Sequence, residues 1–270
     1  MLLCSACSSS RTNAILASHL TGANWQIVAV DPDDGVMRQL TRTPTDKRMP
    51  VVSTDPSSVI YRSNEGDLCR INIRGGVARQ FISGDQITSF DVRANLIAVS
   101  RIRGAPLSNT DVWLGKQDRP DRCVLDEVAR EEDVAISPDG SKLAYSRRMP
   151  GEPQDLWLYD VTTGKRTQLT SGQRWTLCAC WSPDGTRLAY ASNTFGDFEI
   201  FVVEIGTGKM IRLTNDAGFD SFPAWSPDGQ CIAFVSNRSG ALRIWLMNAD
   251  GSGQRCLTAD ESEFRELSWR

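Results

Sequence analysis

Short apolar segments alternate with polar turn segments along the whole chain. Residues 188–192 (LAYAS) and 232–236 (IAFVS) alternate with a period of two between turn residues, as half-buried β-strands do. Helical periodicity is nearly absent, and only Arg122–Val134 has a pattern that suits a helical turn or two. The pattern therefore predicts an all-β protein.

The strand pattern repeats with a period of 44 residues. The segments AISPDGSKLAYSRR, CWSPDGTRLAYASN and AWSPDGQCIAFVSN align almost without gaps. Two sets of side chains follow the same repeat: the tryptophans Trp181, Trp225 and Trp269, and the aliphatics Leu68, Val112, Leu156, Ile200 and Ile244. A third recurrence closes the units, with the threonines Thr41, Thr170, Thr214 and Thr258. A repeat of this length indicates one supersecondary unit that stacks on its copies.

A unit of about four short antiparallel strands every 40 to 45 residues is typical of a propeller blade. Two degenerate units, 61–83 and 96–116, lack the SPDG turn, and a first unit begins near Asn13, which makes six. The tail Phe264–Trp269 aligns with the first strand of a unit that has no continuation. We expect a six-bladed β-propeller of four-stranded antiparallel blades, closed by the C-terminal strand completing the first blade. Residues 1–10 are expected to be a flexible tail, and residues 11–270 a single domain.

Several recurring or unusual side chains have structural interpretations. The aspartates of the SPDG turns (Asp139, Asp184 and Asp228) are expected to accept hydrogen bonds from turn amides, and the repeated tryptophans to pack blade against blade. Cys69, Cys231 and Cys256 lie in alternating segments and are interpreted as small buried hydrophobes. The pairing of the eight cysteines stays open.

Composition and charge exclude several kinds of function. The chain has 270 residues with a formal net charge of -3, whereas a surface that follows nucleic-acid phosphates usually carries a basic excess. No apolar run approaches the roughly 20 residues that span a bilayer. The single histidine, His19, excludes sites built from two or three histidines, and we expect it in a surface loop. GxSxG does not occur, so we expect no enzyme, no cofactor and no metal site.

The segments WSPDG, SNRSG, IWLMNADGSG and the closing LT resemble the TolB-like propeller repeat, strongly from Ala135 onward and more weakly before it. The resemblance implies a six-bladed propeller that binds a protein, as TolB binds the peptidoglycan-associated lipoprotein. It also implies a periplasmic or cell-envelope location. Serine-peptidase propellers and pectin-degrading lyases share the repeat, so it implies the fold more firmly than the role.

The N-terminus bears on location. The start MLLCSAC lacks the basic and apolar regions of a complete signal peptide, and we expect no extra N-terminal domain of the TolB kind before the repeats. It resembles the end of a bacterial lipoprotein signal, which predicts lipidation of Cys7 if the true start lies upstream. If Met1 is the true start, a cytoplasmic location is expected.

The candidate binding face carries the loops after each second strand and those that lead into the next innermost strand. Its predicted binding residues are Arg101, Arg103, Arg147, Arg148, Trp175, Phe195, Phe219 and Arg238. The acidic residues Glu127, Glu131, Glu132 and Asp133 cluster there as well. Arginine and aromatic residues are enriched at protein interfaces, which favours a protein partner, although an ordinary solvated surface is the alternative.

The alternative function is a hydrolase or lyase that works in the central channel. Asp91, Asp133 and Glu266 are expected near the axis, where carboxylates are able to hold a calcium or magnesium ion. No residue spacing requires such a site.

Overall fold

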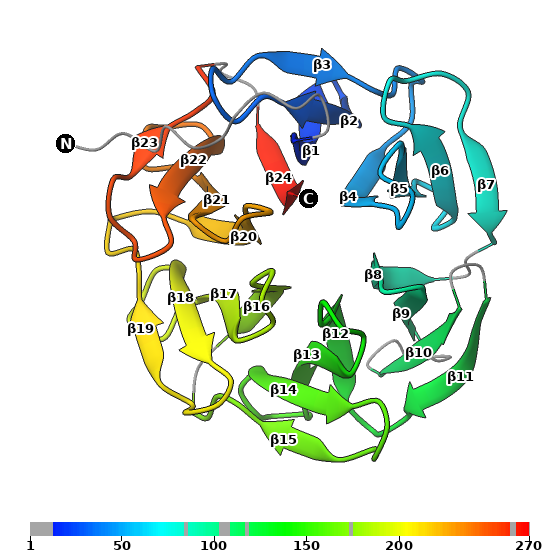
Figure 1. Ribbon diagram of the computed structural model, residues 1–270, viewed down its shortest axis with the longest axis vertical. Helices are drawn as coiled ribbons and strands as arrows, with labels where there is room; N and C mark the ends of the chain where they lie inside the picture. Colours follow the sequence, from blue (N-terminus) through cyan, green and yellow to red (C-terminus); the bar gives the residue numbers. More distant parts are fainter. Residues whose placement is uncertain are drawn as a thin grey trace.

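The computed structural model describes residues 13–83, 86–102, 109–116, 119–172, 175–259 and 263–269. Every regular element in this part of the chain is a β-strand, and the strands form six antiparallel sheets of four, arranged radially around an axis (Figure 1). The predicted six-bladed β-propeller is confirmed. The expected tail at residues 1–10 lies outside the described residues. No helix long and apolar enough to cross a membrane occurs within the described ranges.

In every blade the four strands follow one another from the axis outward. Blade 1 contains β24 (Phe264–Trp269), β1 (Ile15–Thr21), β2 (Asn24–Val30) and β3 (Met37–Gln39). Blade 2 contains β4 (Lys47–Val52), β5 (Ser58–Ser63), β6 (Leu68–Asn72) and β7 (Arg79–Ile82). Blade 3 contains β8 (Ile87–Arg93), β9 (Leu96–Ile102), β10 (Thr110–Lys116) and β11 (Arg119–Leu125).

The other three blades continue in chain order. Blade 4 contains β12 (Arg130–Ile136), β13 (Lys142–Arg148), β14 (Asp155–Asp160) and β15 (Arg166–Gln168). Blade 5 contains β16 (Thr176–Trp181), β17 (Arg187–Ser192), β18 (Glu199–Glu204) and β19 (Met210–Arg212). Blade 6 contains β20 (Asp220–Trp225), β21 (Cys231–Ser236), β22 (Arg243–Asn248) and β23 (Arg255–Cys256).

The ring closes through β24, which pairs antiparallel with β1 inside blade 1 (Figure 1). Phe264 is fully buried, and its ring centroid lies 4.7 Å from that of His19, on the facing strand. Trp269 donates from Nε1 to Asn13 Oδ1 at 2.6 Å. The predicted closure is therefore confirmed. The expectation for His19 was wrong, because this residue lies within β1 and is only 8% exposed.

Neighbouring blades pack through clusters of buried apolar side chains. One cluster joins blades 4 and 5: it contains Leu156 and Leu158 of β14, and Trp181 and Tyr190 of blade 5. Trp181 also donates from Nε1 to the backbone oxygen of Ala135 at 3.0 Å, across the same boundary. The interpretation of this repeated tryptophan as blade-to-blade packing is confirmed.

The closing threonines tie the outer strand of a blade to the strand inside it. Thr170 Oγ1 accepts the Leu156 amide at 2.9 Å and donates to Asp155 Oδ1 at 3.0 Å. Thr214 holds the equivalent amide of Ile200, also at 2.9 Å. The same contact is made by Thr41 and Thr258. The outer strands of these blades have only two or three residues, so this side-chain bond supplements a very short backbone ladder.

The SPDG turns are stabilised by their aspartates. Asp139 Oδ1 accepts the Ser141 amide at 3.0 Å and the Ser137 hydroxyl at 2.6 Å. These bonds favour the ionised carboxylate, and the Ser137 hydroxyl is the largest cause that lowers the pKa of Asp139 to about 2. Asp184 and Asp228 make the corresponding bonds. The predicted turn role is confirmed.

Two local predictions were wrong. The segment Arg122–Val134 contains the end of β11 and the beginning of β12, with a short turn between them, and no helix. Cys256 is exposed on the outermost strand of blade 6, whereas Cys231 is buried as expected and Cys69 is partly buried. The six cysteines within the described residues are free thiols.

We predict that Phe264→Ala lowers the free energy of unfolding by about 3–5 kcal/mol, because it empties a fully buried site in the closing sheet. Val77→Ala is the control, since Val77 is 89% exposed and the change is expected to cost less than about 0.5 kcal/mol. Urea unfolding followed by tryptophan fluorescence measures both. Equal midpoints for the two variants would show that closure by β24 does not hold the fold together.

Candidate binding face and axial cavity

The predicted binding residues lie on four consecutive blades. Arg101 is on blade 3, Arg147 and Arg148 end β13 of blade 4, Trp175 and Phe195 flank strands of blade 5, and Phe219 and Arg238 belong to blade 6 (Figure 1). Arg103 lies outside the described residues. The sequence therefore placed these residues along one arc of the ring, but the structure gives them different environments.

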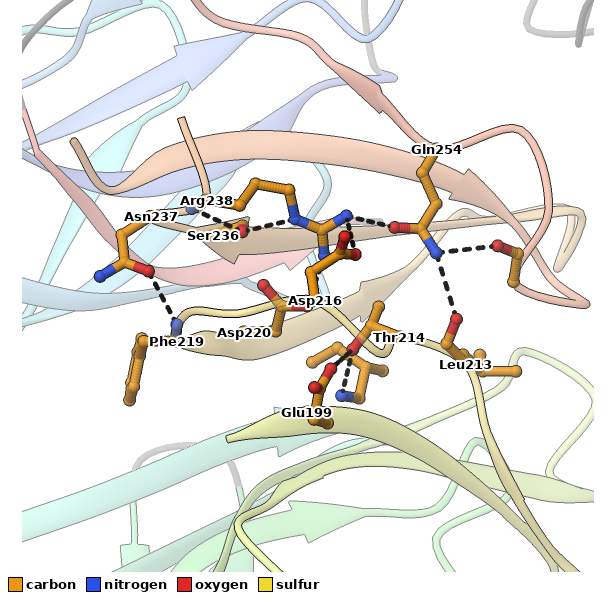
Figure 2. Close-up of polar contacts among 12 residues, drawn as sticks. Glu199, Leu213, Thr214, Asp216, Phe219, Asp220, Ser236, Asn237, Arg238 and Gln254 are labelled. Carbon is orange, nitrogen blue, oxygen red and sulfur yellow. Dashed lines mark hydrogen bonds and ion pairs between the residues drawn. The ribbon is translucent and has the colours of Figure 1, made fainter. Parts of the chain in front are cut away.

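Arg238 is engaged inside the protein. Its guanidinium contacts Asp220 at 2.5 Å and Asp216 at 2.7 Å, and it donates to Gln254 Oε1 (Figure 2). It also lies over the Trp245 ring, 4.8 Å from the centroid. The Arg238 side chain is only 12% exposed and the Asp220 side chain only 1%, so this arginine neutralises a buried carboxylate. Its first role is to stabilise the loop of blade 6.

Arg147 and Arg101 repeat part of this arrangement. Arg147 contacts Glu127 at 2.6 Å, and Glu127 also pairs with Arg166. The Arg147 guanidinium lies 5.0 Å from the centroid of Trp157, and that of Arg101 lies 5.9 Å from Trp113. In each blade the arginine ends the second strand and the aromatic ring belongs to the third, so the pair joins neighbouring strands.

An asparagine after the second strand fixes the aromatic residue that precedes the inner strand. Asn193 Oδ1 accepts the Trp175 amide at 2.9 Å, and Asn237 Oδ1 accepts the Phe219 amide at 2.7 Å (Figure 2). Gly218 permits this close approach, because a Cβ there would lie 2.7 Å from Asn237 Oδ1. Sequence reasoning missed this role of asparagine, although Ser-Asn recurs 44 residues apart and supplied the signal.

Trp175 and Phe195 are the most exposed of the predicted binding residues that the structure describes, and we define the Trp175 patch as these two residues together with Arg148. Arg148 lies over the Trp175 ring, 4.7 Å from its centroid. Trp175 is 39% exposed and Phe195 68% exposed. Arg212 lies over the Phe195 ring at 5.1 Å, and it is anchored by Glu199 at 2.7 Å. The patch crosses the boundary between blades 4 and 5. The hydrogen bond from the Trp175 amide to Asn193, which we call the Asn193 clamp, holds the Trp175 backbone.

The acidic run at the start of blade 4 is not one cluster. Glu132 pairs with Arg130 at 2.8 Å, whereas Asp133 lines the central cavity. Glu131 is fully buried, and neither carboxylate oxygen has a hydrogen-bond partner among the described residues. Burial raises the pKa of Glu131 to about 8, against the opposing effect of Arg166. The Glu131 carboxyl is therefore protonated in the folded protein at neutral pH.

A β-bulge recurs in the innermost strands and re-aims one side chain per blade. The bulged residue has a positive φ, between 53° and 57°, although none of these residues is glycine. The positions are Met49, Asp133, Cys178, Phe222 and Glu266. All five line a central cavity of about 430 Å³, together with the part of each inner strand that runs from the bulge toward the next turn. The bulge is thus the local feature that turns these side chains toward the axis.

The three acids expected near the axis line this cavity. Asp91 accepts the Ile136 amide at 2.8 Å, and Glu266 is paired with Arg48 at 2.7 Å. Within the described ranges, no three His, Cys, Asp or Glu side chains lie close enough together to hold a metal ion. Placement of the acids at the axis is confirmed, but their spacing does not provide the expected alternative of a divalent-cation site.

Comparison with known proteins identifies relatives of this fold. Residues 132–270, just over half of the chain, match the sequence model of the TolB beta propeller domain. The uncharacterized peptidase YuxL of Bacillus subtilis is 33% identical over 70 residues, which cover 24% of this chain and 11% of that protein. Dipeptidyl-peptidase 5 of Porphyromonas endodontalis is 39% identical over 70 residues, 23% of this chain and 10% of that protein. Only about a tenth of each curated relative is matched.

Solved structures show the same fold over almost the whole chain. A protein assigned as TolB from Agrobacterium tumefaciens has a TM-score of 0.74 and 22% identity, covering 91% of this chain and 88% of that one. TolB from Acinetobacter baumannii has a TM-score of 0.80 and 16% identity, covering 95% and 66%. An oligogalacturonate lyase in complex with manganese has a TM-score of 0.59 and 15% identity, covering 87% and 85%. At these identities the similarity establishes the fold alone.

We predict that Glu131→Gln removes a pH dependence of stability. The pKa of this carboxyl is about 8 in the folded protein and 4.5 when unperturbed, so the folded state retains the proton to higher pH. The resulting stabilisation is complete below about pH 4.5 and is lost as the pH rises toward 8. Relative to the variant, the native protein is expected to lose about 1 kcal/mol per pH unit between pH 5 and 7.

Urea unfolding at pH 5, 6, 7 and 8 measures this difference. Glu132→Gln is the matched control, because the neighbouring carboxylate is paired with Arg130 and partly exposed. If the stability curves of the native protein and Glu131→Gln run parallel, Glu131 does not carry the proton.

Proposed function

The chain belongs to the TolB beta propeller domain family, and from this premise we propose that it is a non-enzymatic interaction module that binds a protein or cell-envelope partner through the Trp175 patch. The observation that carries the proposal is the exposed Trp175 ring with Arg148 stacked over it at the boundary of two blades. The hypothesis includes two further points: membrane anchoring through Cys7, which lies outside the described residues, and a role as an accessory subunit of a larger complex.

The patch has the chemistry of an interface anchor. Tryptophan and arginine, with tyrosine, are the residues most enriched among those that dominate binding energy: tryptophan buries a large rigid ring, and arginine presents several N–H donors in a planar fork. The Asn193 clamp holds the Trp175 backbone before any partner arrives, and Phe195, two residues after Asn193, presents a second aromatic ring that is 68% exposed. Preorganisation of this kind favours specific binding.

The charge of the patch indicates what the partner presents. Arg147 and Arg238 are neutralised by Glu127, Asp216 and Asp220, whereas Arg148 has its guanidinium on the Trp175 ring. An arginine stacked on an aromatic ring retains its in-plane N–H donors for a carboxylate. We therefore expect a partner surface with an acidic group beside an apolar one.

The enzymatic alternative has weaker support. Peptidase relatives match only about 70 residues of repeat, and the lyase resemblance is one of fold. The only histidine lies buried against Phe264 in blade 1, away from the axial cavity lining. Two of the three carboxylates at the axis are engaged, Asp91 by the Ile136 amide and Glu266 by the Met49 amide and Arg48. These observations favour a binding role over a hydrolase or lyase.

We predict that Arg148→Glu and Trp175→Ala each abolish capture of the native partner while the fold is retained. Reversal of charge opposes an acidic partner, and truncation of tryptophan removes the apolar anchor, which typically weakens binding by about 2 kcal/mol or more. The measurement is affinity purification of the tagged protein from its native source at physiological salt, with quantitative mass spectrometry of co-purified proteins.

The matched control is Arg79→Glu, because Arg79 is an exposed arginine on the outer strand of blade 2, distant in the ring from the patch (Figure 1). Support requires a protein that is captured by the native chain and by Arg79→Glu but by neither patch variant. If the same proteins are captured by all four chains, the Trp175 patch is not the binding surface.

A further inference from the structure

The axial cavity offers a second site, separate from the Trp175 patch. Its volume of about 430 Å³ lies within the range of small-molecule pockets. Much of its wall is apolar or aromatic, with contributions from Phe90, Trp181, Phe222, Trp225 and Trp269. The lining comes from all six inner strands, which are held in a closed ring (Figure 1). The pocket is therefore formed by the scaffold itself and needs no partner to shape it.

Two carboxylates of the lining differ in how well they are hydrogen-bonded. Glu266 is fully engaged: Arg48 contacts both of its carboxylate oxygens, and the Met49 amide donates to it at 2.8 Å. Asp133 occupies the equivalent bulge position three blades away, and its described hydrogen bonds are long ones, from the Cys178 amide at 3.4 Å and the Ser146 hydroxyl at 3.3 Å. The same fold position thus carries a compensated carboxylate in one blade and a weakly bonded one in another.

We propose that the axial cavity binds a small organic cation, an ammonium group on an apolar body, with Asp133 as its counter-ion. Asp91 and Asp133 outnumber the single arginine of the lining, Arg93, once Glu266 is balanced by Arg48, so the cavity favours positive charge. An ammonium group supplies the strong donor that Asp133 lacks, and the aromatic walls take up the apolar body. This site does not depend on the loop-face partner.

The protonation of Asp133 makes the binding pH-dependent. Burial, with a contribution from the neighbouring Glu132 carboxylate, raises the pKa of Asp133 to about 6. Above that pH the carboxylate is charged and attracts a cation, and binding is lost as the pH falls through 6. A primary alkylamine stays protonated over the whole range, since its pKa is about 10. The ligand's own titration therefore does not contribute.

The test uses three probes that share one body: 4-phenylbutylamine, 4-phenylbutanol and 4-phenylbutyrate. Binding to the full chain at pH 7.5 is followed by ligand-observed NMR and by calorimetry. The amine is expected to bind about tenfold or more tightly than the alcohol or the acid, because only the amine forms a charge-assisted hydrogen bond with Asp133. At pH 5 this preference is expected to vanish.

Three variants locate the site. Asp133→Asn keeps the size and acceptor oxygen of the side chain and is expected to weaken amine binding about tenfold or more. Asp121→Asn is the matched control, because Asp121 is exposed on β11 and does not line the cavity. Ala179→Leu fills the cavity wall and is expected to weaken all three probes. Thermal unfolding checks that each variant is folded.

Several outcomes would overturn the proposal. One is equal affinity of the native chain and a folded Asp133→Asn for the amine, and another is equal binding of all three probes. Absence of saturable amine binding to the native chain contradicts it directly. Binding of a lysine-containing polypeptide in the cavity, with no binding of the small amine, would assign the cavity to a macromolecule instead.

Discussion

The pairing of β24 with β1 is the interaction on which the rest of the structure depends (Figure 1). Each of the other five blades is continuous in the chain, whereas blade 1 is assembled from both ends of it. Without β24, the axial edge of β1 would have no partner, and the buried Phe264 and Trp269 would leave the packing against blade 6. Closure also extends to blade 2, because Glu266 of β24 receives Arg48 and the Met49 amide.

Closure also explains how strained backbone is tolerated at the axis. A non-glycine residue with positive φ costs of order 1 kcal/mol, and five inner strands contain one at the same position. Each bulged strand is held by its own sheet and by two neighbouring blades, so the conformation is over-determined. The bulge amide of one blade donates to the bulge side chain of the preceding one at Met49 and Cys178. The five strained residues thereby place their side chains in a ring that lines the cavity.

The fold could be predicted well from the sequence because the residues that determine it recur in several blades. The SPDG turns, the tryptophans and the closing threonines each recur from blade to blade, and the turn aspartates and threonines make the same contact in every blade that has them. Single-copy features were harder to predict. The Arg122–Val134 segment joins the outer strand of blade 3 to the inner strand of blade 4, whereas SPDG turns join the first and second strands of a blade, so no repeated turn separated its two strands.

The candidate site was only partly predictable, because sequence position does not tell which way a side chain points or which partner it meets. Sequence position placed Arg148 and Arg238 on the same arc, but it carried no information on which one finds a buried carboxylate such as Asp220. The adjacent acids Glu131 and Asp133 were grouped because they are neighbours in the chain. The repeat placed Asp133 near the axis, but the bulge that separates its surroundings from those of Glu131 falls on a non-glycine residue and has no signature in a single sequence.

One inner strand, β12, contributes residues both to the loop face and to the axial cavity. β12 begins at the loop face with Arg130, and it reaches the cavity three residues later at Asp133. Between these points, the Glu131 backbone is bonded to Thr110 of blade 3. Neither the Trp175 patch nor the cavity lining needs the other to be occupied in order to form, because this strand is held by its own sheet and by blade 3. The proposed partner on the face and the proposed ligand at the axis would therefore occupy separate surfaces of one scaffold.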